Sequence, residues 1–164
     1  CDKQVMNKFK GVQGHNLVSI GDVDPMKRVL NFGFSNWITS RLIKISETEF
    51  IGEHFGYRRE FGITHRRHIV LKDTVVEVFD YIFDVKNKVS VNQNWITMYQ
   101  VDNRSNDDTS FFINKDIRIS SNISGGISDF GISNYYQHFD KGNKLCFTKV
   151  VEKDFCICTK IELN

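Results

Sequence analysis

The chain has 164 residues, 40% of them hydrophobic, and a formal net charge of +2 at pH 7. That length suits one domain with a proper core, and the balanced charge lacks the strongly basic face that indicates a nucleic-acid partner. No apolar run is long enough to cross a bilayer, so we expect no membrane partner either.

The residue types favour strands over helices. The chain contains no alanine and little leucine, whereas isoleucine, valine, threonine and phenylalanine are abundant. β-Branched and aromatic residues suit a pleated, half-buried surface. We therefore predict an all-β fold.

The first predicted strands are separated by turn residues. Residues 15–20 form a candidate strand, and residues 21–25 predict a turn because they combine glycine, aspartate and proline. Residues 28–34 and 41–51 each alternate in the manner of a half-buried strand. The apolar side chains on one face of residues 28–34 are Leu30, Phe32 and Phe34.

The central stretch predicts a β-hairpin. Residues 63–71 and 74–82 are typical of strands, and a tight turn at Lys72 and Asp73 joins them. Both faces of the first strand begin with polar residues, such as His65, and end with apolar ones. We expect this strand to run out of the core toward one edge of the sheet.

The rest of the chain continues the all-β pattern. Further strands are predicted at residues 95–101, 111–119, 134–139, 146–151 and 155–163. Exposed loops are expected at residues 103–108 and 121–126. Many strands at short spacing, without a helical period, predict a single domain over residues 1–164: a two-layer antiparallel β-sandwich.

The four cysteines lack the paired spacing of a structural zinc site. They are Cys1, Cys146, Cys156 and Cys158. Alternation in the last strand places Cys156 and Cys158 on one face, where a bond between them is geometrically unfavourable. We interpret them as small buried hydrophobes rather than as a redox pair, and a bridge from Cys1 to another cysteine stays open.

No complete catalytic set is present. The chain has no GxSxG elbow, phosphate-binding glycine-rich loop or HExxH motif. His65 and His68 are three residues apart in a predicted strand, so they face opposite ways and cannot bind one metal together. We predict no catalytic residue here and a hydrogen-bonded structural role for each histidine.

Several short segments, in this order, resemble the C-terminal β-domain of heparinase II/III-like polysaccharide lyases. They are GHNLVSIGD at residues 14–22, GEHFGY at 52–57, THRR at 64–67, Asp80, ISDFG at 127–131 and TKIEL at 159–163. Leu17 stands where threonine is usual in that family. The resemblance covers nearly the whole chain.

The resemblance implies a C-terminal fragment of a larger lyase whose N-terminal α/α-toroid is missing here. The family cleaves acidic, uronate-containing polysaccharides such as heparin-type glycosaminoglycans by β-elimination, in the periplasm or outside the cell. A base removes the proton α to the uronate carboxylate, and an acid protonates the leaving oxygen. The main tyrosine and histidine lie on the toroid, so we expect this chain to be inactive alone. Its implied partners are the polysaccharide and the helical domain. The start at Cys1, with no initiator methionine and no signal-peptide pattern, also suggests a processed chain or a fragment.

The family's metal ion, zinc or another divalent metal, lies between the two domains. An upstream histidine and aspartate bind it together with the histidine of the His-Asn motif, which corresponds to His15. One imidazole cannot hold zinc, which needs three or four ligands. We therefore expect a metal in the full-length protein and no cofactor in this chain by itself.

Several side chains near the central hairpin could meet carboxylate or sulfate groups, since arginine pairs with both in bidentate geometry. They are Tyr57, Arg58, Arg59, Arg66 and Arg67. Arginines at strand ends also pair with acidic residues, here Glu60, Glu77 or Asp80, and we expect most of them to do so. Tyr57 and Arg58 are predicted to reach the substrate cleft.

A second class of function remains open, a free-standing carbohydrate-binding or structural β-sandwich module. A binding module needs exposed aromatic side chains on which sugar rings can stack. The candidates are Trp37, Trp95, Tyr135 and Tyr136. Large aromatic residues in strands more often belong to the core.

Overall fold

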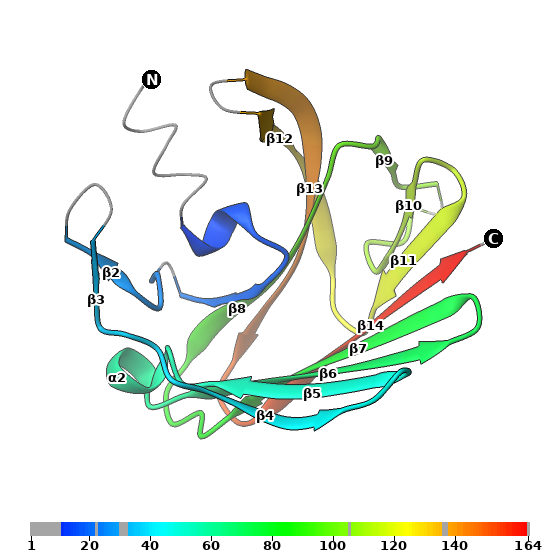
Figure 1. Ribbon diagram of the computed structural model, residues 1–164. Helices are drawn as coiled ribbons and strands as arrows, with labels where there is room; N and C mark the ends of the chain where they lie inside the picture. The colour runs from blue at the N-terminus through cyan, green and yellow to red at the C-terminus, as the bar shows by residue number, and fades with distance from the viewer. Residues whose placement is uncertain (1–10, 22, 30–32, 105, 136–137, 164) are drawn as a thin grey trace.

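Two antiparallel sheets form the body of the molecule in the computed structural model (Figure 1), which describes residues 11–21, 23–29, 33–104, 106–135 and 138–163. The small sheet consists, in spatial order, of β1 (Val18–Ile20), β8 (Val89–Thr97), β13 (His138–Val151) and β12 (Gly125–Tyr135). The large sheet consists of β4 (Ser40–Ile45), β5 (Glu49–His54), β6 (Thr64–Lys72), β7 (Val75–Phe83), β14 (Phe155–Leu163), β11 (Ile117–Ser121), β10 (Ser110–Ile113) and β9 (Val101–Asp102). The predicted all-β, two-layer antiparallel sandwich is confirmed.

Three smaller elements flank the sheets. A two-stranded hairpin pairs β2 (Lys27–Arg28) with β3 (Phe34–Ser35). A 3-10 turn, η1 (Val12–Gly14), precedes β1, and the short helix α2 (Arg58–Phe61) precedes β6. None of the helices among the described residues is long and apolar enough to cross a membrane.

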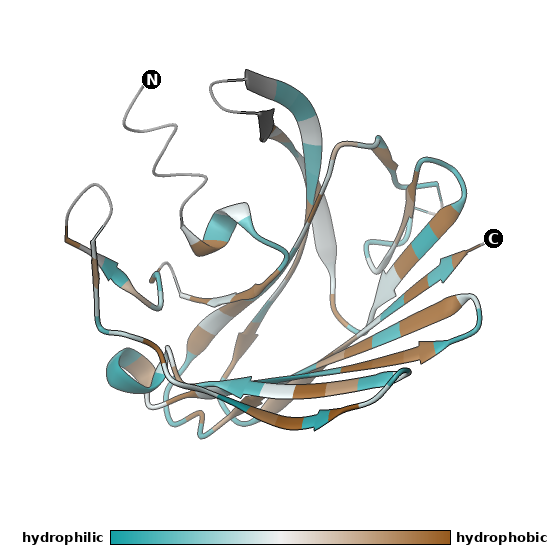
Figure 2. Ribbon diagram, in the orientation of Figure 1, coloured by the Kyte–Doolittle hydropathy of each residue, from teal (hydrophilic) through white to brown (hydrophobic). Residues whose placement is uncertain are grey.

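The core lies between the sheets. Strands such as β7 and β8 contribute alternate side chains to it. Figure 2 shows alternating hydrophilic and hydrophobic bands along the large sheet. Fully buried residues of the small sheet include Ile20, Val91 and Phe147, and those of the large sheet include Ile82 and Ile157. Burial of these side chains stabilises the fold by roughly 1.5–3 kcal/mol each.

The central hairpin and the last strand form as predicted. β6 and β7 pair antiparallel through a turn at Asp73, which has a φ of 43°, and β14 covers residues 155–163. β6 does run from the core to an edge, but its buried end is the polar one. His65 is 2% exposed, whereas Leu71 at the far end is 46% exposed.

Two of the predicted N-terminal strands are hairpins instead. Within residues 28–34, Arg28 and Phe34 pair with each other across the β2–β3 hairpin, while Leu30 and Phe32 lie outside the described residues. Residues 41–51 fold back between β4 and β5 through a turn without proline or glycine. The prediction missed this turn because no strong turn residue marks it.

Two predicted strands in the C-terminal half also contain turns. Residues 111–119 reverse between β10 and β11 at Asn114 and Lys115, whose φ values of 48° and 70° suit a tight hairpin turn. Residues 134–139 span the end of β12 and the start of β13, where Tyr135 pairs with His138. Neither segment is a continuous strand.

Candidate functional site

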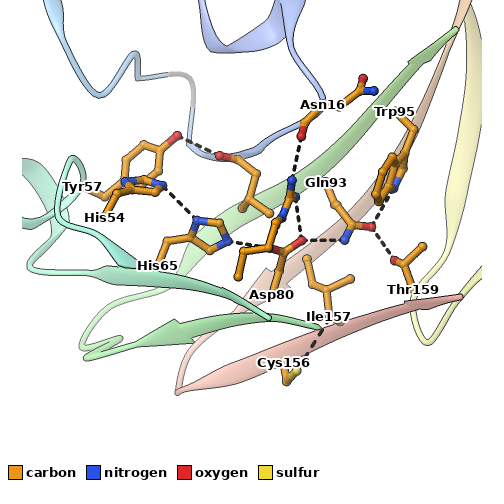
Figure 3. A network of polar contacts seen from close by, with 12 residues as sticks. Asn16, His54, Tyr57, His65, Asp80, Gln93, Trp95, Cys156, Ile157 and Thr159 are labelled. Atoms are coloured by element: carbon orange, nitrogen blue, oxygen red, sulfur yellow. Dashed lines mark hydrogen bonds and ion pairs between the residues drawn. The ribbon is translucent and has the colours of Figure 1, made fainter. Parts of the chain in front are cut away.

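Asp80 is the centre of a buried polar network between the sheets (Figure 3). It is 0% exposed, and its Oδ1 accepts hydrogen bonds from His65 Nε2 and Arg67 Nε, both at 2.7 Å. Its Oδ2 accepts from Arg67 at 2.8 Å and from Gln93 Nε2 at 2.7 Å. Four hydrogen bonds and one guanidinium therefore offset the burial of this carboxylate.

The network connects the two sheets. Gln93, in β8 of the small sheet, donates to Asp80 and accepts from Thr159 of the large sheet at 2.6 Å and from Trp95 Nε1 at 3.0 Å. Arg67 also donates to the carbonyl of Asn16 at 2.8 Å, ahead of β1. A single set of polar side chains therefore fixes how the layers sit on each other.

The hydrogen bonds determine the tautomers of two histidines. The backbone N–H of Gly56 donates to His54 Nδ1 at 3.3 Å, so the ring proton of neutral His54 is on Nε2. His54 Nε2 then donates to His65 Nδ1 at 2.9 Å, which leaves His65 Nε2–H to donate to Asp80. Burial, together with the neighbouring His65 and Arg67 side chains, lowers the pKa of His54 to about 4.

The polar groups at the centre of the network are hydrogen-bonded to one another. Burial acts to raise the pKa of Asp80, but hydrogen bonds and charge from His65 and Arg67 outweigh it and hold that pKa well below its ordinary value. Both ring nitrogens of His65 are engaged, and the imidazole is 2% exposed. No donor or acceptor of the pair remains for a substrate.

A second ion-pair cluster lies on the outer face of the large sheet. Glu53, only 6% exposed, accepts from Arg66 at 2.8 Å and from Arg41 at 2.7 Å. His68 lies on the same outer face, where its Nε2 is 2.9 Å from Glu49. His65 and His68 thus face opposite ways, as predicted, and take part in separate hydrogen-bonded clusters.

The two predicted substrate-binding residues are in different environments. Tyr57 is 1% exposed and donates its hydroxyl to the carbonyl of Val18 at 3.0 Å; burial raises its pKa. This side chain packs in the core, and its predicted substrate contact has no support in its surroundings. Arg58 is exposed at the start of α2, donates to Thr64 Oγ1 at 3.0 Å, and lies 4.1 Å above the ring of Phe55.

A pocket of about 530 Å³ opens beside α2. Its lining residues come from the β2–β3 hairpin, the segments on either side of it, and residues 55–60; they include Asp24, Lys27, Trp37, Arg59 and Glu60. Trp37 is 82% exposed, and Arg59 donates to the side-chain oxygen of Asn36. The pocket combines an exposed indole, two cations and two carboxylates.

Of the other aromatic candidates, Trp95 is the one whose side chain the structure describes. Trp95 is half-buried against the core and hydrogen-bonded to Gln93. Tyr136 and the side chain of Tyr135 lie outside the described part of the chain. The sequence prediction named Trp37 but not the pocket, because residues 23–27, 36–39 and 55–60 meet only through the fold.

His15 lies at the end of η1 and is exposed. The described residues contain no cluster of three or more His, Cys, Asp or Glu side chains able to hold a metal ion. Zinc needs at least three such ligands, so the donors described here do not fit a metal site by themselves. A metal bound by His15 in a longer protein stays a prediction.

Comparison with known proteins supports the resemblance seen in the sequence. Residues 3–101 match the model of a family described as heparinase II/III-like, C-terminal. Among solved structures, 99% of the chain aligns with a heparinase III gene product at a TM-score of 0.75 and 17% identity. The same share aligns with the heparan sulfate lyase HepC from Pedobacter heparinus at a TM-score of 0.63 and 12% identity. The alignments cover 26% of each of those chains, so this chain spans about a quarter of their length. A search of the curated proteins found no match.

Proposed function

This chain belongs to the family of heparinase II/III-like C-terminal domains, and we propose that it is the β-domain of a lyase acting on acidic, uronate-containing polysaccharide by β-elimination. One structural relative is named as a heparan sulfate lyase, which supports an acidic polysaccharide as the substrate class. We also propose a periplasmic or extracellular location, where such polymers are encountered.

In this proposal the base and the acid of the elimination come from the helical domain. Among the described residues, the buried histidine–carboxylate pair His65–Asp80 has its groups fully engaged. The β-domain then supplies binding energy and supports the cleft. Its own chemistry consists of holding anionic groups of the polymer.

The observation that carries the proposal is the pocket beside α2. An exposed indole offers a face for a sugar ring, and Arg59 and Lys27 offer cations for a carboxylate or sulfate. Glu60 can accept hydrogen bonds from sugar hydroxyls. The carboxylate of Asp24 already accepts from the backbone N–H of Val12 at 2.7 Å, so it positions the pocket wall.

The test uses Trp37→Ala and Arg59→Ala in the full-length protein, with heparan sulfate and alginate as substrates. Loss of a stacking or charge-assisted contact remote from the reacting bond is expected to raise KM about 10-fold with little change in kcat. Arg118→Ala is the control, because this exposed arginine lies in β11, across the large sheet from α2 (Figure 1). An unchanged KM in both pocket variants contradicts the proposal.

The chain alone is expected to produce no unsaturated uronate. The product of elimination absorbs in the ultraviolet, so absorbance measured with purified chain and polysaccharide tests this directly. A steady rise in absorbance would show that the chain contains its own base and acid.

The exposure of Trp37 also supports the second candidate, a free-standing carbohydrate-binding module. The two candidate functions differ in whether a catalytic helical domain accompanies this β-domain. Binding of heparin or alginate by the chain, measured by gel retardation and lost in Trp37→Ala, fits both. A full-length protein that binds polysaccharide without any lyase activity favours the module.

A further inference from the structure

Two cysteine thiols lie side by side on the outer face of the large sheet. Cys156 and Cys158 alternate with the fully buried Ile157 in β14, so both side chains point away from the core. Figure 3 shows Cys156 and Ile157 on opposite sides of the strand. Their Sγ atoms are 3.7 Å apart, and both are half-buried free thiols. The prediction that they share a face is confirmed, but neither is a fully buried core residue.

One side chain holds the backbone of both cysteines. The amide of Asn122 donates to the carbonyl of Cys156 at 3.0 Å and accepts from the N–H of Cys158 at 2.9 Å. On the other side of β14, Tyr81 and Phe79 of β7 pair with Cys156 and Cys158. The two thiols are therefore positioned together by the sheet and by this clamp.

The number and type of donors decide which ligand fits. Zinc and calcium require at least three or four ligands, and the described residues offer no further His, Asp or Glu for such a cluster. A disulfide is disfavoured, because alternate residues of a strand are roughly 6.6 Å apart, near the upper limit for a bridge. Two sulfurs suit a soft cation that accepts two ligands.

We propose that Cys156 and Cys158 form a two-thiol binding site for a soft, thiophilic cation, for which monovalent copper is the probe. The cation displaces one proton from each thiol, both protons go to solvent, and no electron is transferred. Binding therefore strengthens as the pH rises.

The experiment titrates full-length protein with Cu(I) under anaerobic, reducing conditions against a chromophoric chelator. Cys156→Ser and Cys158→Ser are each expected to lose one tightly bound ion per chain, with affinity at that site falling roughly 100-fold or more as chelation is lost. Cys146→Ser is the matched control, since Cys146 is another half-buried free thiol, in β13. It is expected to bind as the wild type does.

A second measurement uses the wild-type protein, so its result does not depend on whether the serine variants fold. Stoichiometric Cu(I) is expected to protect Cys156 and Cys158 from alkylation, whereas Cys146 reacts as before, as seen by peptide mapping. Unprotected Cys156 and Cys158, binding unchanged in both serine variants, or an equal loss in Cys146→Ser each overturn the proposal.

Discussion

Two pairs of adjacent arginines, alike in sequence, have different surroundings. Arg66 and Arg67, in β6, bind the buried carboxylates of Glu53 and Asp80. In α2, by contrast, Arg58 donates to a threonine hydroxyl and Arg59 to an asparagine amide. No carboxylate lies within 4.0 Å of either helix arginine among the described residues.

This difference in partners indicates which arginines stabilise the fold and which are available to bind a ligand. A guanidinium beside a carboxylate has its charge neutralised, and a buried pair fails if one partner is removed. A guanidinium beside a neutral partner keeps its charge for a ligand. The strand arginines are therefore expected to matter for folding, and the helix arginine that lines the pocket, Arg59, for the polysaccharide.

The largest effect is expected at the centre of the buried network. Asp80→Asn removes the charge that neutralises Arg67 and places an amide N–H₂ against the donors of Arg67 and Gln93. We expect the free energy of unfolding to fall by roughly 3–5 kcal/mol, measured by urea denaturation.

The control for that variant is in the same strand. Glu77→Gln removes the exposed ion pair with Lys72 and is expected to cost no more than about 1 kcal/mol. Similar losses in Asp80→Asn and Glu77→Gln would show that the buried network has no special weight in stability.

The next effect is a pH dependence. His54 is neutral in the fold with a pKa of about 4 against 6.5 for the free side chain, so between these values the unfolded chain binds the extra proton. Stability is therefore full above pH 6.5 and falls as the pH drops toward 4, by roughly 3 kcal/mol at most. Thermal unfolding from pH 7 to about 5 measures most of this fall, in a range above the ordinary pKa values of 3.8 for Asp80 and 4.5 for Glu53.

Variants of two histidines test whether His54 causes this dependence of stability on pH. His54→Gln is expected to flatten it, although the variant is less stable overall because His65 Nδ1 loses its donor. His15→Gln, at an exposed position, is expected to leave the slope unchanged. A slope that persists in His54→Gln assigns the titration to another group.

A smaller effect is expected on the outer face. Arg66→Ala removes the two hydrogen bonds that Arg66 donates to Glu53 Oε1. The free energy of unfolding is therefore expected to fall by about 1–3 kcal/mol. Arg41→Ala removes the other partner of Glu53, but this side chain is 62% exposed and water can replace it. Equal losses in the two variants would contradict this ranking.

Much of the fold could be predicted from sequence because alternation and residue type act locally. β6, β7 and β14 appear where the pattern placed them, and the shared face of Cys156 and Cys158 follows from the same period. Two of the missed turns, the one between β4 and β5 and the one at Asn114 and Lys115, lack proline and glycine. Their positions depend on which strands pair, and that depends on residues distant in sequence.

The site was less predictable for the same reason. The resemblance named Tyr57 and Arg58, yet the hydroxyl of Tyr57 faces β1. Trp37 and Arg59 line the same pocket only because the fold brings residues 36–39 close to residues 55–60. The sequence of β6 also could not show what His65 contacts, because its partners His54 and Asp80 lie in two other strands, β5 and β7, and Gln93 of β8 completes the bonds of Asp80.

The smallest expected change in stability is at Arg59, and it is the sharpest test of the comparison. Its one hydrogen-bond partner among the described residues, Asn36, is an exposed side chain, so Arg59→Ala is expected to alter the free energy of unfolding by no more than about 0.5 kcal/mol. The same variant is the one expected to raise KM for the polysaccharide, whereas Arg66→Ala should lose stability and keep its KM. Urea denaturation and steady-state kinetics on both variants measure the four quantities. If Arg59→Ala loses as much stability as Arg66→Ala, the neutral partner of Arg59, Asn36, does not distinguish a binding arginine from a stabilising one. If Arg66→Ala alone raises KM, the outer face of the sheet, and not the pocket, binds the polymer.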